Sequence, residues 1–96
     1  IHAVRDTMAG SGVTKEDYEK GLYQLIAPEL PSDTPKEFIG SVVECLADRT
    51  FDRVSGVTKK NVANAKDEVA ERDVVLFDTY TDECGREVAE QLVDGN

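Results

Sequence analysis

The sequence is poor in the residues on which many enzymes and metal sites depend. Its 96 residues include no tryptophan, one methionine, one histidine and two cysteines. Because the single histidine, His2, stands near the N-terminus, a histidine-activated nucleophile and a zinc site both lack the residues they need. The chain also has no GxSxG elbow, no glycine-rich phosphate loop and no CxxC pair. We therefore expect no catalytic, cofactor-binding or metal site, and we expect the protein not to be an enzyme.

Long apolar runs and basic charge are also scarce. No run approaches the roughly 20 apolar residues that span a bilayer, so we expect no direct membrane insertion. Lysine and arginine number 11 against 20 acidic residues, which gives a net charge of −9. This charge argues against binding to nucleic acid or to anionic membranes. Because the chain is short and has no linker-like stretch, residues 1–96 are predicted to form a single domain.

The negative charge is concentrated in the last third of the chain. Residues 67–96 carry ten acidic and two basic residues, a net of −8, whereas residues 1–66 carry a net of −1. Carboxylates spaced by about one helical turn can share a face, and the candidates for such a face are Asp78, Asp82, Glu83, Glu87 and Glu90. The face either is simply solvated or docks a basic partner or a loosely held cation. Basic residues that could balance it within the fold are Arg49, Arg53, Lys59 and Lys60.

Apolar residues at helical spacing predict a first helix over residues 13–27. Thr14 is its expected N-cap, with Asp17 at the third helical position. The residues of its apolar face are Tyr18, Leu22, Leu25 and Ile26. Gly21 costs this helix about 1 kcal/mol relative to alanine. We therefore expect the backbone of another element to approach closely at Gly21.

A second helix is predicted from Pro35 to about Arg49, with Thr34 as its N-cap and Pro35 in its first turn. It shows the clearest hydrophobic periodicity in the chain. Two adjacent rows form a wide stripe of the kind that faces a core, and their members are Phe38, Val42, Cys45, Ile39, Val43 and Leu46. One of the two cysteines therefore falls on a predicted core face.

The C-terminal third is predicted to be helical as well, with Thr58 as its N-cap. We expect either one helix from about residue 59 to residue 92 or two helices with a bend near residues 68–73. The stretch DVVLF, residues 73–77, has strand propensity, but it has no evident partner strand. In a helix, one face of this region would carry Ala70, Val74, Phe77, Tyr80, Cys84 and Val88.

The N-terminal segment is predicted to be small and separate from these helices. Residues 1–12 form a short helix or a mobile segment, because the glycines of AGSG, residues 9–12, interrupt any regular element. Since the chain begins at Ile1 and not at methionine, we also expect residues upstream of it in the gene product, such as a signal peptide or a lipid anchor.

The two cysteines have two interpretations. Cys45 and Cys84 are either buried free thiols, which is common for cysteine, or the ends of one disulfide between the second and the last helix. Closing a loop of this length stabilises a protein by roughly 4 kcal/mol in the chain-entropy model. Because both face inward on different predicted helices, the sequence favours the bond. The predicted fold class is therefore all-α: a small bundle of three to four helices with a long C-terminal helix, stapled by one disulfide.

A cysteine near the end of a helix is followed here by an aromatic-Asp-x-Val-Ser stretch, a capped helix and a second cysteine in the last helix. The residues of this layout are Cys45, Phe51, Asp52, Val54, Ser55, Thr58 and Cys84. It resembles small disulfide-containing helical domains of secreted or lipid-anchored actinobacterial proteins of unknown function, over about residues 14–90. The resemblance implies export, a disulfide and an extracytoplasmic role, and it implies no catalytic residues. This chain departs from those domains in reading NAKDEVAERD where they have a Gly-Asp-rich break.

Our functional hypothesis is a secreted or cell-envelope helical domain that binds a protein partner. The alternative is a cytosolic acidic adaptor, or an antitoxin-like or immunity-like inhibitor, that covers a basic surface of its partner. A long amphipathic C-terminal helix could also pair with its own copy, so a homodimer is a further option.

Overall fold

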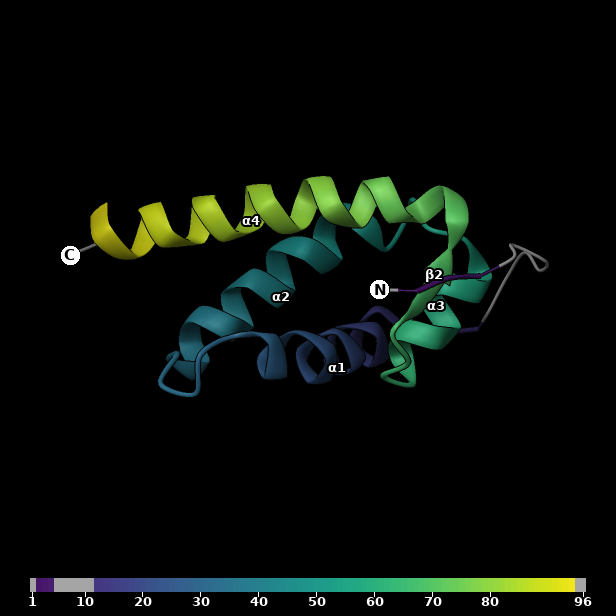
Figure 1. Cartoon of the computed structure of the whole chain (residues 1–96), viewed down its shortest axis with the longest axis horizontal. Coiled ribbons are helices and arrows are strands. Elements are labelled where there is room, and N and C mark those ends of the chain that lie inside the picture. The colour runs from purple at the N-terminus through teal and green to yellow at the C-terminus, as the bar shows by residue number, and fades with distance from the viewer. Residues whose placement is uncertain (1, 5–11, 95–96) are drawn as a thin grey trace.

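The computed structural model describes residues 2–4 and 12–94, and within these ranges helices dominate (Figure 1). The α-helices are α1 (Lys15–Ile26), α2 (Lys36–Thr50), α3 (Gly56–Ala63) and α4 (Val74–Asp94). The shorter elements are strands β1 (His2–Val4) and β2 (Glu68–Ala70) and the 3₁₀ turns η1 (Ala27–Glu29) and η2 (Glu71–Asp73). Helices α1 and α4 lie along opposite sides of the molecule, and α2 crosses obliquely between them (Figure 1). The predicted helical bundle with a long C-terminal helix is confirmed.

The N-terminus differs from the prediction. His2–Val4 form a strand, not a helix, and β1 pairs in parallel with β2. The register places Ala3 opposite Val69. The local sequence gives no sign of this pairing, because the partner strand is distant in sequence, with His2 opposite Glu68. The rest of the predicted N-terminal segment, residues 1 and 5–11, lies outside the described residues.

Residues 56–94 contain two α-helices, α3 and α4, and not one continuous helix. Helix α3 ends at Ala63, and Ala65 then adopts a left-handed backbone conformation with φ of 58°. The chain turns back there, runs through β2 and η2, and starts α4 at Val74. The break is therefore longer than the predicted bend. The strand propensity of residues 73–77 is not realised, because most of this stretch forms the first turn of α4.

One of the three predicted N-caps is confirmed and two are wrong. Thr14 caps α1, since its Oγ1 accepts a hydrogen bond from the Asp17 N–H at 3.1 Å. Thr34 does not cap α2, because Pro35 occupies that position and makes no side-chain cap bond. Thr58 does not begin α3 either. Ser55 caps it three residues earlier and accepts from the Thr58 N–H at 3.4 Å.

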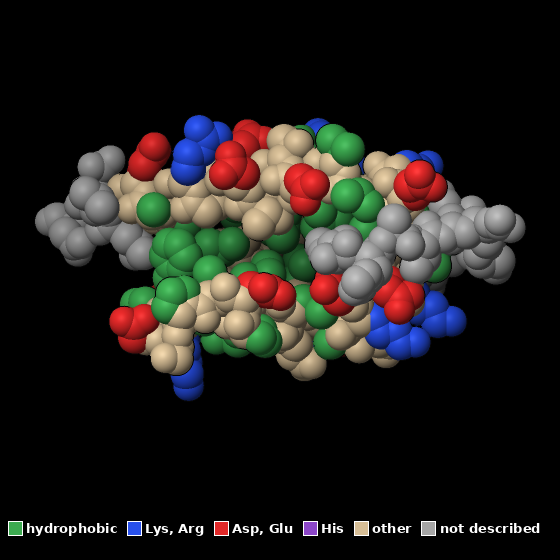
Figure 2. Space-filling view, viewed as in Figure 1, with side chains coloured by type: hydrophobic (Ala, Val, Ile, Leu, Met, Phe, Trp, Pro, Cys, Tyr) green, Lys and Arg blue, Asp and Glu red, His purple; other side chains and the backbone are tan. Residues whose placement is uncertain are grey.

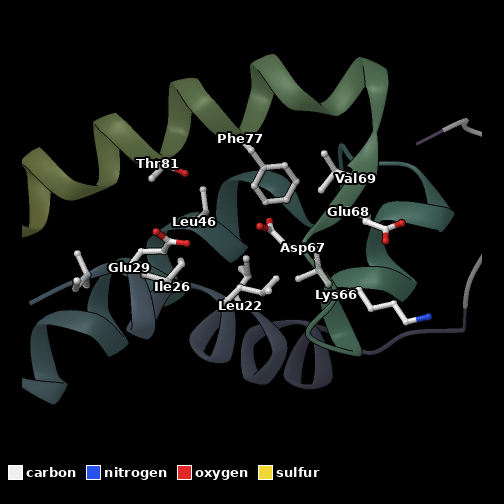
Figure 3. Close-up of a pocket in the computed structure, with 13 residues that line it drawn as sticks. Leu22, Ile26, Glu29, Leu46, Lys66, Asp67, Glu68, Val69, Phe77 and Thr81 are labelled. Carbon is white, nitrogen blue, oxygen red and sulfur yellow. The ribbon is translucent and has the colours of Figure 1, made fainter. Parts of the chain in front are cut away.

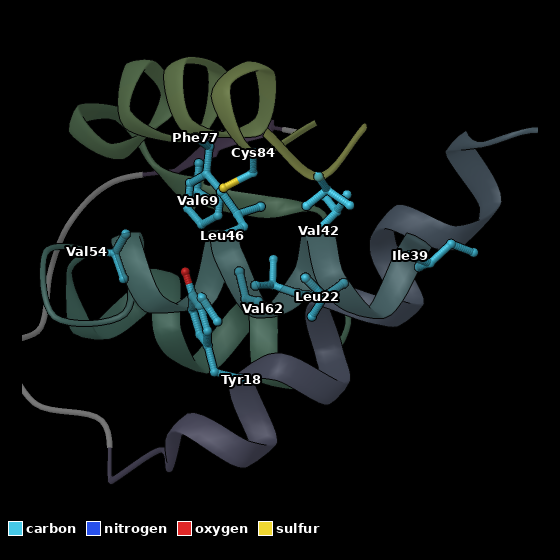
Figure 4. Packing of buried hydrophobic residues seen from close by; sticks show 13 residues of the cluster. Tyr18, Leu22, Ile39, Val42, Leu46, Val54, Val62, Val69, Phe77 and Cys84 are labelled. Atoms are coloured by element: carbon cyan, nitrogen blue, oxygen red, sulfur yellow. The ribbon is translucent and has the colours of Figure 1, made fainter. Parts of the chain in front are cut away.

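Apolar side chains from all four helices and from β2 meet in one core (Figure 4). The largest side chain within it is that of Tyr18, which is fully buried. Its ring packs edge-on against the ring of Phe51, with the two ring centroids 5.2 Å apart. Its hydroxyl oxygen lies 2.8 Å from Thr50 Oγ1. The Thr50 hydroxyl donates in turn to the Leu46 carbonyl at 2.8 Å. Burial raises the pKa of the Tyr18 hydroxyl, so this chain of hydrogen bonds links α1 to α2 in its neutral form.

Helices α1 and α3 touch at Gly21, as the sequence analysis expects. A β-carbon at this position would overlap the Val62 carbonyl oxygen and would come within 2.9 Å of the Ala63 α-carbon. Both obstacles are backbone atoms, so they can yield only if the two helices move apart. Glycine is therefore required at this crossing for close packing rather than for a special backbone conformation.

We predict that Gly21→Ala lowers the free energy of unfolding by at least about 2 kcal/mol, because the added methyl overpacks the α1–α3 contact. Urea unfolding followed by circular dichroism measures this change. Gly40→Ala is the matched control. A β-carbon there meets nothing within 4 Å, so we expect it to be neutral or to stabilise α2 by up to about 1 kcal/mol. Equal effects of the two substitutions would contradict the close approach at Gly21.

Candidate functional site

A pocket of about 310 Å³ opens between α1 and α4 (Figure 3). Its apolar lining consists of Leu22, Leu25, Ile26, Leu30, Leu46, Val62, Val69 and Phe77. Its polar lining consists of Glu29, Lys66, Asp67, Glu68 and Thr81. The space-filling view shows the same region as a band of hydrophobic side chains in a groove between the two helices (Figure 2). The site is thus an apolar pocket with a charged edge.

The pocket exists because α1 and α4 each pack mainly against other elements. Helix α1 packs on α2 and α3, and α4 packs on α2. Leu22 and Ile26 enter the pocket from α1, and Phe77 enters from α4 on the opposite side (Figure 3). Leu46 of α2 lies between them. The apolar periodicity of the sequence predicts that these residues lie on core faces, and it does not predict a pocket. The apolar face of α1 is wide and includes Leu25, and this width is the one feature of the sequence that could have indicated apolar surface beyond the core.

The charged edge of the pocket is mainly acidic. Glu29 lies at one end and Glu68 at the other, and the Asp67 carboxylate is directed toward the pocket (Figure 3). The Lys66 ammonium points away from it (Figure 3). Carboxylates beside apolar surface suit the binding of a group that is partly apolar and partly cationic.

The predicted acidic face of α4 is divided in the structure. Asp78, Asp82 and Glu90 are exposed, whereas Glu83 and Glu87 are partly buried. At 100° per residue, Asp78 and Asp82 lie on a different side of the helix from the other three. Among the described residues, no group of three or more potential ligands is placed to hold a metal ion. Asp78 and Asp82 are thus separated around α4 from the other three residues, and a role of these five carboxylates in an interaction face stays a prediction.

Arg49 of α2 and Glu87 of α4 form a bidentate ion pair. Arg49 Nη1 and Nη2 donate to the two carboxylate oxygens, each at 2.7 Å. Another member of the basic group, Arg53, donates to the Tyr80 hydroxyl at 2.6 Å. The sequence predicts that basic residues neutralise part of the acidic segment within the fold, and the ion pair of Arg49 with Glu87 is one such case.

The pair predicts a pH-dependent contribution to stability. The hydrogen bonds from Arg49 lower the pKa of Glu87 below its ordinary value of 4.5. A carboxyl group with a lowered pKa in the folded state stabilises the fold above its ordinary pKa, and this contribution is lost as the pH falls through the lowered pKa. Glu87→Gln should therefore lower the melting temperature slightly at neutral pH, and the difference from wild type should vanish in acid. Glu90→Gln removes a carboxylate at an exposed site on the same helix and is the matched control for the loss of one negative charge. If the difference in melting temperature between Glu87→Gln and wild type stayed the same at every pH, the result would contradict the ion pair.

A buried carboxylate, which no motif in the sequence marks, joins the start of α4 to the start of α3. Asp73 is 2% exposed, and its Oδ2 accepts from the Ser55 N–H at 3.1 Å, from Ser55 Oγ at 3.1 Å and from Thr58 Oγ1 at 2.6 Å. Thr58 Oγ1 also accepts from the Ala70 N–H at 2.7 Å. These bonds offset the cost of burying the charge. A serine at an N-cap position is a local signal for the start of α3, but nothing in the sequence near Asp73 marks this residue as the partner of Ser55 and Thr58.

Cys45 and Cys84 form a disulfide between α2 and α4, with their α-carbons 5.8 Å apart. Cys84 is fully buried and Cys45 is partly buried. The inward placement that the helical spacing predicted is confirmed for both. The bond holds α4 against α2 one turn beyond Thr81, which lines the pocket.

We predict that breaking this bond lowers the melting temperature by more than about 10 °C, because the open chain regains the entropy of a loop closed across 39 residues. Thiol alkylation followed by intact mass measurement, with and without reductant, reports the bond, and a thermal melt of each form reports its contribution. Cys45→Ala should melt like the reduced protein. Labelling of both thiols without reductant, or identical melts, would contradict a structural bond.

Comparison of the chain with models of protein families, with curated proteins and with solved structures gave no match. The resemblance to actinobacterial exported domains therefore stays a prediction. Among the described helices, none has both the length and the apolar character needed to cross a bilayer.

Proposed function

We propose that the chain is an extracytoplasmic helical domain that binds a protein partner, and that the pocket between α1 and α4 takes up an apolar part of that partner. The pocket is the observation that carries this proposal. Its volume of about 310 Å³ is at the lower end of ligand pockets and suits one or two large side chains. Its walls are aliphatic and aromatic, so filling it removes apolar surface from water.

Two features favour an extracytoplasmic setting. The Cys45–Cys84 bond is of a kind that persists in oxidising compartments and is rare in the cytosol. Small secreted domains with thin cores commonly rely on such bonds for stability. The sequence layout that resembles exported domains agrees with both features. The partner class follows from the open apolar pocket, because exposed apolar surface of this kind typically marks an interaction site.

The alternative is an acidic adaptor or inhibitor that binds a basic partner through α4. The exposure of Asp78, Asp82 and Glu90 favours it. Two observations weigh against it: Glu87 is already held by Arg49, and the disulfide does not suit the cytosol. Such a complex would not depend on the pocket, so a change that fills the pocket separates the two proposals.

We predict that an amphipathic helical peptide with a leucine face and glutamine at its other positions binds the domain in the pocket. Fluorescence anisotropy with the labelled peptide measures the affinity for wild type and for Thr81→Phe. The new ring of Thr81→Phe should occupy the pocket and weaken binding by at least about tenfold. Thr79→Phe is the matched control. It adds the same ring at an exposed position of α4 that does not line the pocket, and its affinity should stay at the wild-type level.

Thermal melts of both variants establish that they are folded. Absence of binding to wild type would contradict the proposal. So would an affinity of folded Thr81→Phe equal to that of Thr79→Phe.

A further inference from the structure

We infer that the partner segment is a basic amphipathic helix, which places an apolar anchor in the pocket and lysine or arginine side chains against its two acidic ends. This inference rests on the proposed function and names the chemistry of its partner. Three observations carry it: the sign of the charge at the edge of the pocket, the separation of that charge into two ends, and the orientation of α1.

The edge of the pocket has an excess of negative charge. The described ionic groups among its lining residues are Glu29, Asp67, Glu68 and Lys66. The excess comes from Glu29 and Glu68, which are exposed, because the one basic group of the lining, Lys66, points away from the pocket (Figure 3). The protein as a whole carries a net charge of −9, so its field also attracts cations. An occupant with basic groups beside its apolar surface complements this edge.

Helix α1 adds to the negative electrostatic potential at the edge of the pocket. It ends at Ile26, and its last turn contains no basic residue. Leu25 and Ile26 line the pocket, so the negative end of the helix dipole lies beside it. Glu29 follows within the next turn and extends the negative region. The end of the pocket formed by α1 and η1 therefore favours a cation.

The two acidic ends select an elongated occupant over a small amine. Glu29 and Glu68 lie at opposite ends of the pocket in Figure 3, and the lining residues of α1, of η1 and of the position after η1 run from Leu22 to Leu30. That length corresponds to about 12 Å of helix, or roughly two turns. A helix with apolar residues at positions i, i+4 and i+7 and basic residues on both flanks of that face matches this spacing.

The test compares three peptides that share one leucine face and differ at the flanking positions, which are glutamine, lysine or glutamate. We expect the lysine peptide to bind wild type about tenfold more tightly than the glutamine peptide, and the glutamate peptide to bind more weakly than both. Added salt should remove most of the lysine advantage, because the ionic groups are near the surface.

A pair of matched double variants locates the charge effect. Glu29→Gln with Glu68→Gln neutralises the two ends of the pocket. Glu44→Gln with Glu90→Gln makes the same change in net charge at exposed residues that do not line it. The first pair should abolish most of the advantage of the lysine peptide over the glutamine peptide. The second pair should leave that advantage close to the wild-type value.

The outcomes separate this inference from the proposed function. Equal affinities for all three peptides would overturn the basic-helix inference and leave the pocket as a protein-binding site. An equal loss in the two double variants would also overturn it, because the attraction would then arise from net charge alone. If no peptide binds wild type, the proposed function itself fails. Thermal melts of the double variants confirm that each is folded under the assay conditions.

Discussion

The buried carboxylate of Asp73 is the constraint on which the arrangement of the helices depends. A buried charge is costly unless donors surround it, and here they come from Ser55 and Thr58 at the start of α3. The beginning of α4 is thus fixed to the beginning of α3. Helix α3 is fixed in turn to α1, because Gly21 lets the two backbones approach closely. The first turn of α4 therefore has a defined position relative to α1 even though the two helices pack mainly elsewhere.

A second constraint acts further along α4. The Cys45–Cys84 bond and the Arg49–Glu87 ion pair hold the middle of this helix against α2. With its start and its middle both fixed, α4 cannot move across the gap to cover the apolar face of α1. These links consequently hold the pocket open, although closing it would bury more apolar surface. In this protein the disulfide, the ion pair and the buried hydrogen bonds set the position of α4, and the burial of further apolar surface does not.

The sequence predicts features whose causes are local. Thr14 caps the helix that begins at the next residue and accepts from an N–H only three positions away, and the apolar periodicity of the second helix places Cys45 correctly. Features with distant causes are missed. Thr58 looks like an N-cap, but its hydroxyl bonds to residues 12 and 15 positions later. The pairing of β1 with β2 is hidden for the same reason. The pocket is missed because periodicity shows which residues are apolar and not which of them a neighbouring helix covers.

The disulfide also bears on how the proposed site would bind. Cys45 precedes Leu46, which lines the pocket from α2, and Cys84 follows Thr81 by one turn of α4. The bond therefore fixes one wall of the pocket relative to its base. A wall that is already in place loses little conformational entropy when a partner enters, so more of the gain from apolar burial remains as affinity. The covalent link that suits an oxidising compartment thus also preorganises the pocket, which connects the stability of this small domain to its proposed role in binding.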